Sequence, residues 1–119
     1  MLYKSHEELP VFHFSHKITL EIYKLTSKFP NSELYGIISQ LRRAISSIPA
    51  NIVEGFYRAT KKELVRFLII ARGSCGETRY FLLLAKDLGY LKIEDYKSVD
   101  EDLRNLHKQI NGWIRSINA

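Results

Sequence analysis

Four stretches of this 119-residue chain repeat apolar residues every three or four positions, and this repeat limits the folds open to it. An interval of three to four residues places side chains on one face of an α-helix, whereas a strand alternates every second residue. The sequence carries no clear alternating stretch. It therefore predicts an all-α protein.

The first predicted helix ends at Pro30. Residues 1–12 are expected to form an N-terminal arm, because Pro10 disfavours a helical conformation in the residue before it. The helix itself is expected over residues 14–29, where isoleucine, leucine and phenylalanine recur at helical spacing.

The second predicted helix has a cap at Asn31 or Ser32 and closes at the Phe56–Tyr57 pair. Pro49 lies within its apolar stripe. A proline there removes the hydrogen bond to the carbonyl of Ile45, so we expect a kink and not an end.

The third predicted helix begins after Thr60 and continues to Gly89. Thr60 and Glu63 have the spacing of a capping box, and a glycine at the far end supplies a left-handed stop.

The last helix begins near Glu94 or at the capping box of residues 98–101, and the pattern fits both starts. Long amphipathic helices joined by short turns predict a single domain over residues 1–119, an antiparallel up-down-up-down four-helix bundle.

Composition favours a cytoplasmic protein without metal or cofactor. A single cysteine cannot form an internal disulfide, and a chain of this length can bury a sufficient core without such a crosslink. Apolar runs stay well short of the roughly 20 residues that span a bilayer. Glu7 and Glu8 stand where an export signal would be basic, so we expect no membrane association.

The net charge of +5 is concentrated in one part of the chain. Between Arg42 and Arg79 there are eight basic and three acidic residues, while the remainder balances to zero. Such segregation suits a surface that binds a polyanion, although solvated helix faces are an equally simple interpretation. In an up-down bundle, the turn between the second and third helices shares an end with both termini, which makes that end basic. The candidate nucleic-acid-binding residues are Arg42, Arg58, Lys61, Lys62, Arg66, Arg72 and Arg115.

The third predicted helix carries more apolar residues than one face of a bundle can cover. The additional ones are Val65, Ile69, Ile70, Leu83 and Leu84. An uncovered apolar flank usually marks an interface, so we expect a homo-oligomer. Gly73, Ser74 and Gly76 are small residues in mid-helix, where another helix can cross at short distance.

Few residues suggest chemistry. Cys75 lies in the core register, which favours a buried apolar role over a nucleophile. His13 and His16 lack a further ligand motif, so a solvated surface is the simpler interpretation than a metal site.

Asn51 and Glu54 lie one turn apart beyond the proline of the second helix. Glu54 can pair with Arg58 at the i, i+4 spacing, and Asn51 can bond backbone groups freed by Pro49. We therefore interpret both as structural or interface residues and not as catalytic ones.

Several of these residues form a recognisable pattern. The segments are Ser39–Ala44 (SQLRRA), Ser47–Gly55 (SIPANIVEG), Arg58, and Ala71–Ser74 (ARGS) with Glu77. The chain thereby resembles, over nearly its whole length, the four-helix-bundle proteins encoded in intervening sequences of bacterial 23S rRNA genes. Cys75 and Gly76 depart from this pattern, which more often has a larger apolar residue there.

The resemblance implies a ring-like homopentamer without enzymatic activity. One branch of that family is the accessory variability protein of diversity-generating retroelements, which binds a reverse transcriptase and its template RNA. By motif, Arg43, Asn51, Glu54 and Glu77 look like shared structural or interface positions, and Ile69, Gly73, Ser74 and Leu83 join them on the third helix. The alternative is a protein-interaction scaffold that binds no nucleic acid.

Overall fold

The computed structural model describes residues 3–118, and within that range the regular elements are all helices. They are the 3-10 helix η1 (His6–Glu8), α1 (Pro10–Thr26), the 3-10 helix η2 (Asn31–Glu33), α2 (Ile37–Phe56), α3 (Lys61–Asp87) and α4 (Ile93–Asn118). Each long helix packs against the next one in the chain, and α1 packs against α4. The predicted antiparallel four-helix bundle is confirmed.

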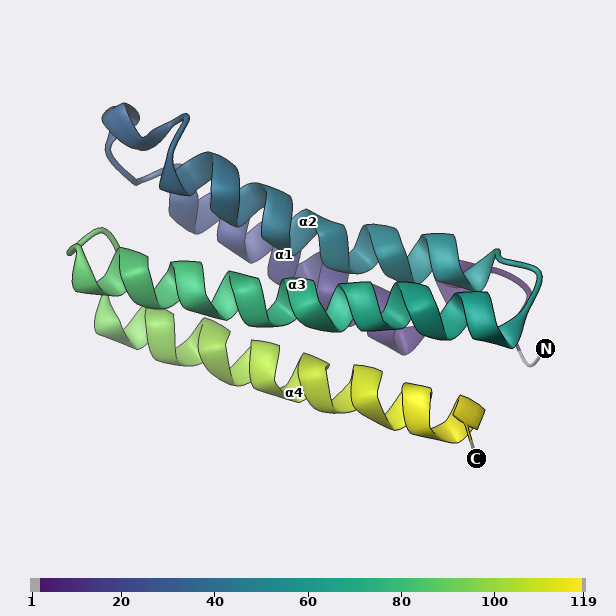
Figure 1. Ribbon diagram of the computed structural model, residues 1–119. Coiled ribbons are helices and arrows are strands. Elements are labelled where there is room, and N and C mark those ends of the chain that lie inside the picture. Colours follow the sequence, from purple (N-terminus) through teal and green to yellow (C-terminus); the bar gives the residue numbers. More distant parts are fainter. Residues whose placement is uncertain (1–2, 119) are drawn as a thin grey trace.

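The bundle measures 44 × 23 × 20 Å, so its length is about twice its width. Both ends of the chain lie at the same end of the bundle as the turn between α2 and α3 (Figure 1). The core runs along the axis, and each long helix contributes fully buried side chains to it, among them Ile22, Ile48, Leu68 and Leu106.

The start of the chain differs from the sequence-based expectation, because α1 begins at Pro10 and not near residue 14. Proline fits the first helical position, where its missing N–H would have no partner in the helix. Residues 6–8 form η1, which Ser5 caps by accepting a hydrogen bond from the Glu7 backbone N–H at 3.1 Å. Half of the expected arm, residues 6–8 and 10–12, is therefore helical, and residues 1 and 2 of that arm lie outside the described range.

The start of α2 also differs from the expectation. The cap predicted at Asn31 or Ser32 is wrong, because residues 31–33 form η2 and α2 begins only at Ile37, after Gly36. The helix then continues through the buried Pro49, and both ends of α3 follow their local signals. Thr60 caps α3 by accepting a hydrogen bond from the Glu63 backbone N–H at 3.2 Å. Gly89 follows α3 with a φ of 83°, the left-handed conformation predicted for it.

The helices α2 and α3 approach closely at Gly55. A Cβ atom on this glycine would lie 2.9 Å from Cβ of Phe67 and 3.1 Å from Cδ1 of Leu64. Only hydrogen on the α-carbon fits there, so Gly55 sets how near the two helices come.

Candidate functional site

The end of the bundle that holds the α2–α3 turn presents exposed cations. Lys61, Lys62 and Arg66 are exposed, and none belongs to an ion pair within residues 3–118. The N-terminal segment reaches this end, where the His6 backbone N–H donates to the hydroxyl of Tyr57 at 3.3 Å. We call Arg58, Lys61, Lys62 and Arg66 the basic end.

Arg58 contributes less free charge to the basic end than its neighbours. Its guanidinium group pairs with the carboxylate of Glu54 one helical turn earlier, as predicted, and lies 4.8 Å from the ring centre of Phe67. Both partners of the ion pair are about half exposed. A pair in that setting stabilises the fold weakly, and Glu54 is a surface partner and not a buried catalytic acid.

Two other predicted nucleic-acid-binding arginines lie elsewhere in the bundle. Arg42 donates from Nε to the hydroxyl of Thr26 at 2.9 Å and stacks 4.7 Å from the ring centre of Tyr23, so it ties α2 to α1. Arg72 donates to the side-chain oxygen of Asn111 at 3.0 Å and joins α3 to α4. The structure therefore does not bring either residue to the basic end. Arg115, the remaining predicted residue, is exposed near the end of α4.

Asn51 belongs to a polar contact between α2 and α3. Its side-chain amide donates to the backbone carbonyl of Ser47 at 2.7 Å and to the hydroxyl of Ser47 at 2.9 Å. That hydroxyl lies 2.9 Å from the hydroxyl of Ser74 on α3. The carbonyl that Asn51 bonds is thus that of Ser47, and not the carbonyl of Ile45 that Pro49 leaves free. This set of hydrogen bonds holds two helices together.

The outward face of α3 is apolar and uncovered within the chain. Ile69, Tyr80 and Leu83 are exposed large side chains on this face. Gly73 and Gly76 lie between them, and a Cβ added to either glycine meets nothing within 4 Å. The helix crossing expected at these glycines is therefore not made by another helix of the same chain. We call these five residues the outer stripe.

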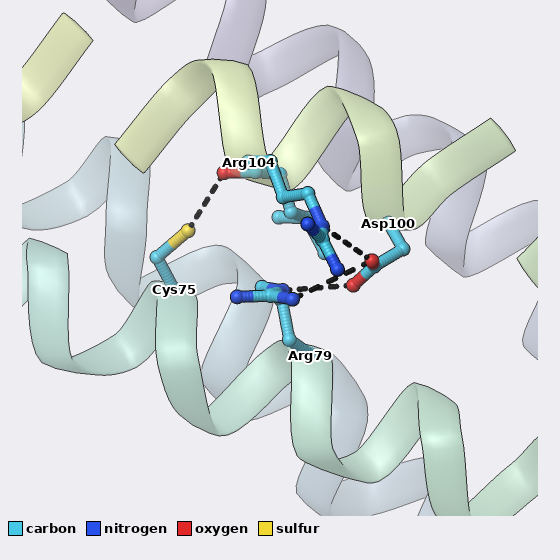
Figure 2. Close-up of polar contacts among 5 residues, drawn as sticks. Cys75, Arg79, Asp100 and Arg104 are labelled. Carbon is cyan, nitrogen blue, oxygen red and sulfur yellow. Dashed lines mark hydrogen bonds and ion pairs between the residues drawn. The ribbon is translucent and has the colours of Figure 1, made fainter. Parts of the chain in front are cut away.

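The sequence pattern gave no indication of a charged cluster between α3 and α4. Asp100 is nearly buried, and its carboxylate accepts hydrogen bonds from Nε of Arg79 at 2.8 Å and from Nε of Arg104 at 3.0 Å (Figure 2). Burial alone would raise the pKa of Asp100, but the two arginines outweigh it and lower that pKa below its usual value. The hydrogen bond to Asp100 likewise raises the pKa of Arg79. The carboxylate of Asp100 therefore holds the guanidinium groups of Arg79 and Arg104 in place.

Cys75 lies beside this cluster and is fully buried, as predicted. Its thiol donates to the backbone carbonyl of Leu103 at 3.3 Å (Figure 2). Burial raises the pKa of the thiol to about 11, although the nearby charge of Arg79 lowers it somewhat. At neutral pH the thiol is protonated, and the thiolate is the form that acts as a nucleophile.

One surface groove has a volume of about 430 Å³ and lies over α1 and α2. It is lined by Tyr23, Leu34, Tyr35, Ile38, Ser39, Arg42, Arg43 and Ser46. These side chains supply aromatic rings and cations but no carboxylate or imidazole to serve as a general base.

The described residues were also considered as metal ligands and as membrane-spanning helices. No group of three or more histidine, cysteine, aspartate or glutamate side chains in residues 3–118 is placed to hold a metal ion. His13 and His16 are both exposed. Over the same residues, every helix is too short or too polar to cross a bilayer.

With this geometry in view, comparison with known proteins places the chain. Residues 7–112 match the family model described as 23S rRNA-intervening sequence protein. The chain belongs to the 23S rRNA-intervening sequence protein family. The resemblance inferred from the motifs is thereby confirmed for nearly the whole chain.

A solved structure similar to this family member has the same fold. It is the crystal structure of a protein of unknown function from the S23 ribosomal protein family of Bacteroides thetaiotaomicron. The TM-score is 0.79 at 26% sequence identity, and the match covers 87% of this chain and 97% of that chain. No curated protein matches.

The residues that carry the family motif here are mostly in α2 and α3. Arg43 and Glu77 are exposed side chains without an ion pair in residues 3–118. Asn51 and Glu54 serve the contacts described above. In this 23S rRNA-intervening sequence protein, two motif residues thus support the protomer, while two leave their charges available to a partner.

Proposed function

We propose that this member of the 23S rRNA-intervening sequence protein family is a non-enzymatic, oligomeric accessory protein that binds RNA, alone or complexed with a reverse transcriptase. The observation that carries the proposal is the group of exposed cations at the basic end that have no ion-pair partner, namely Lys61, Lys62 and Arg66. Cations without partners release the counterions of a nucleic acid when they meet its phosphates, which is the main source of affinity for RNA backbones.

Self-association would strengthen such binding. The outer stripe is the surface we assign to contact between copies, because its glycines leave room for a close crossing and its apolar side chains gain from burial. A ring of parallel subunits, a pentamer by the family resemblance, would gather several basic ends on one rim. Modest charge on each subunit would then add up to a strong local field.

A salt titration of RNA binding tests this function. The probe is a fluorescein-labelled single-stranded RNA of about 30 nucleotides, followed by anisotropy between 50 and 300 mM salt. We expect the affinity to fall steeply as salt rises, and the double variant Lys62→Glu, Arg66→Glu to reduce the log-log slope by about 1.4, or 0.7 per cation.

The matched control reverses two exposed cations elsewhere, Lys24→Glu on α1 and Lys28→Glu in the turn after α1, which changes the net charge equally at a different place. This control should bind nearly as the wild type does. Absence of RNA binding by the wild-type protein at 50 mM salt would refute the proposal and favour the alternative, a scaffold that contacts only proteins.

A further inference from the structure

Four cations of α3 form a straight row that faces α4. Lys61, Arg72, Arg79 and Lys86 follow one another at intervals of 11, 7 and 7 residues. Successive residues of an α-helix are rotated by about 100° around the helix axis. With these intervals, all four side chains project within roughly 20° of one line along the helix. Lys62 and Arg66 lie about 100° and 140° away from that line, so Lys61 alone belongs both to the row and to the exposed cations that carry the proposed function.

Contacts across the helix pair confirm the direction of this row. Arg72 donates to Asn111 of α4 at 3.0 Å, and the Lys86 ammonium lies 4.9 Å from the ring centre of Tyr96. Arg79 bonds the buried carboxylate of α4 described above. The side chains of this row thus lie at the seam between the two helices.

A second row runs along α4 on the same side. Lys97, Arg104, Lys108 and Arg115 follow at intervals of 7, 4 and 7 residues, which keeps them within about 40° of one line. All four side chains are exposed. Since α3 and α4 lie next to each other along their length, the two rows border one strip of surface, which we call the basic seam (Figure 1).

Positive charge outnumbers negative charge in the basic seam. Asp100 is already shared by two arginines, and Asp87 pairs with Lys86 at 3.3 Å. Glu94 and Glu101 are exposed on α4, about one turn before and one turn after Lys97. Eight cations therefore face four carboxylates, and the seam keeps a positive surplus.

The centre of the seam is hollow. A groove of about 310 Å³ is lined by Arg79, Glu101, Arg104, Asn105, His107 and Lys108. Arg104 uses only Nε in its bond to Asp100, so its two terminal nitrogens have no hydrogen-bond partner within the described part of the chain. Guanidinium groups held in this way can donate to a phosphate without first losing conformational freedom.

We infer that the basic seam binds the phosphodiester backbone of a single RNA strand that runs along the bundle axis. This inference rests on the proposed RNA-binding function and adds to the basic end a second, longer surface for it. From Lys61 to Lys86 the seam is about 37 Å long at 1.5 Å per residue. In an RNA duplex each strand winds around the helix axis, so only part of it would stay on a straight seam, whereas an extended strand can follow the whole length.

The seam is tested by reversing three α4 cations that have no ion pair within residues 3–118, in the variant Lys97→Glu, Lys108→Glu, Arg115→Glu. Removing three phosphate contacts should lower the salt slope by about 2 and the affinity for the single-stranded probe by about 100-fold at 0.1 M salt. Because these side chains are exposed, the circular dichroism spectrum and melting temperature should stay close to those of the wild type.

The control variant Lys17→Glu, Lys24→Glu, Lys28→Glu carries the same change of charge on α1 and in the turn after it, and it should lose much less affinity. Equal losses in the two triple variants would overturn the seam while leaving RNA binding itself intact. A wild-type protein that binds no RNA would instead remove the proposed function. Unlabelled duplex RNA that competes as well as the single strand would overturn the assignment to a single strand.

Discussion

At the scale of single residues, Asp100 has the largest local effect on charge. It is the one carboxylate that is nearly buried among the described residues, and both of its charged partners come from the surface of the α3–α4 pair. Removal of a buried carboxylate's charge leaves its cations with weaker hydrogen bonds and stronger mutual repulsion. Asp100 therefore couples the stability of the bundle to the shape of the basic seam.

We predict that Asp100→Asn lowers the free energy of unfolding by about 1–3 kcal/mol at pH 7. The pKa of Asp100 is lowered in the folded protein, so its stabilising effect is present above the ordinary carboxyl pKa and is lost as the pH falls through the folded value. The deficit of the variant should consequently shrink below about pH 4. Urea unfolding of both proteins between pH 3 and pH 7 measures this.

Glu101→Gln is the control for that experiment, because Glu101 is the exposed neighbour on the same helix. It should change the unfolding free energy by less than about 0.5 kcal/mol at every pH. If Asp100→Asn showed the same deficit at pH 3 as at pH 7, the ion pairs would not be the source of its stability.

At the scale of helices, the α2–α3 crossing depends on a residue that has no side chain. Gly55 lies near the C-terminal end of α2, and its α-carbon approaches Phe67 and Leu64 of α3. A methyl group there would require a shift of the α3 backbone or of Cβ of Phe67, neither of which is the free end of a flexible side chain.

We predict that Gly55→Ala destabilises the protein by about 1–3 kcal/mol, because overpacking exceeds the helical preference of alanine. Gly112→Ala is the matched control, since a Cβ at that position of α4 meets nothing within 4 Å. The control should raise stability by about 0.5–1 kcal/mol. Thermal unfolding distinguishes the two, and a stabilised Gly55→Ala protein would contradict the close crossing.

At the scale of the whole molecule, the outer stripe remains uncovered in one chain. Apolar side chains that neither pack on the core nor meet another helix gain free energy when a second molecule covers them. The outer stripe borders the basic seam on α3, because Leu83 follows Arg79 and Gly76 follows Arg72 by four residues, or about 40° around the helix. Contact between copies and contact with RNA would therefore use neighbouring strips of the same helix.

We predict that Ile69→Glu with Leu83→Glu converts an oligomer into single chains, because two charges would be buried in each contact. Both side chains are exposed within the chain, so the fold should persist. Sedimentation velocity at micromolar concentration measures the mass. The control Leu20→Glu with Ile93→Glu alters two exposed apolar residues elsewhere and should remain oligomeric. A wild-type protein that sediments as a single chain would refute the assignment.

Much of the architecture could be predicted from the chain because its determinants are local. Apolar spacing indicates a helix, and Thr60 and Gly89 mark where α3 begins and ends, since caps act through neighbouring backbone groups. The start of α1 was missed because Pro10 was weighed for its effect on the preceding residue and not for its fit at the first helical position.

The sequence by itself determined that the chain forms a four-helix bundle, that Cys75 is buried, and that one flank of α3 is apolar. Only the tertiary structure decided which charges meet. Arg79 and Arg104 lie 25 residues apart, and they share one carboxylate because α3 and α4 pack with a particular rotation about their axes. That rotation depends on the interlocking of side chains from both helices, which no periodicity within a single helix contains.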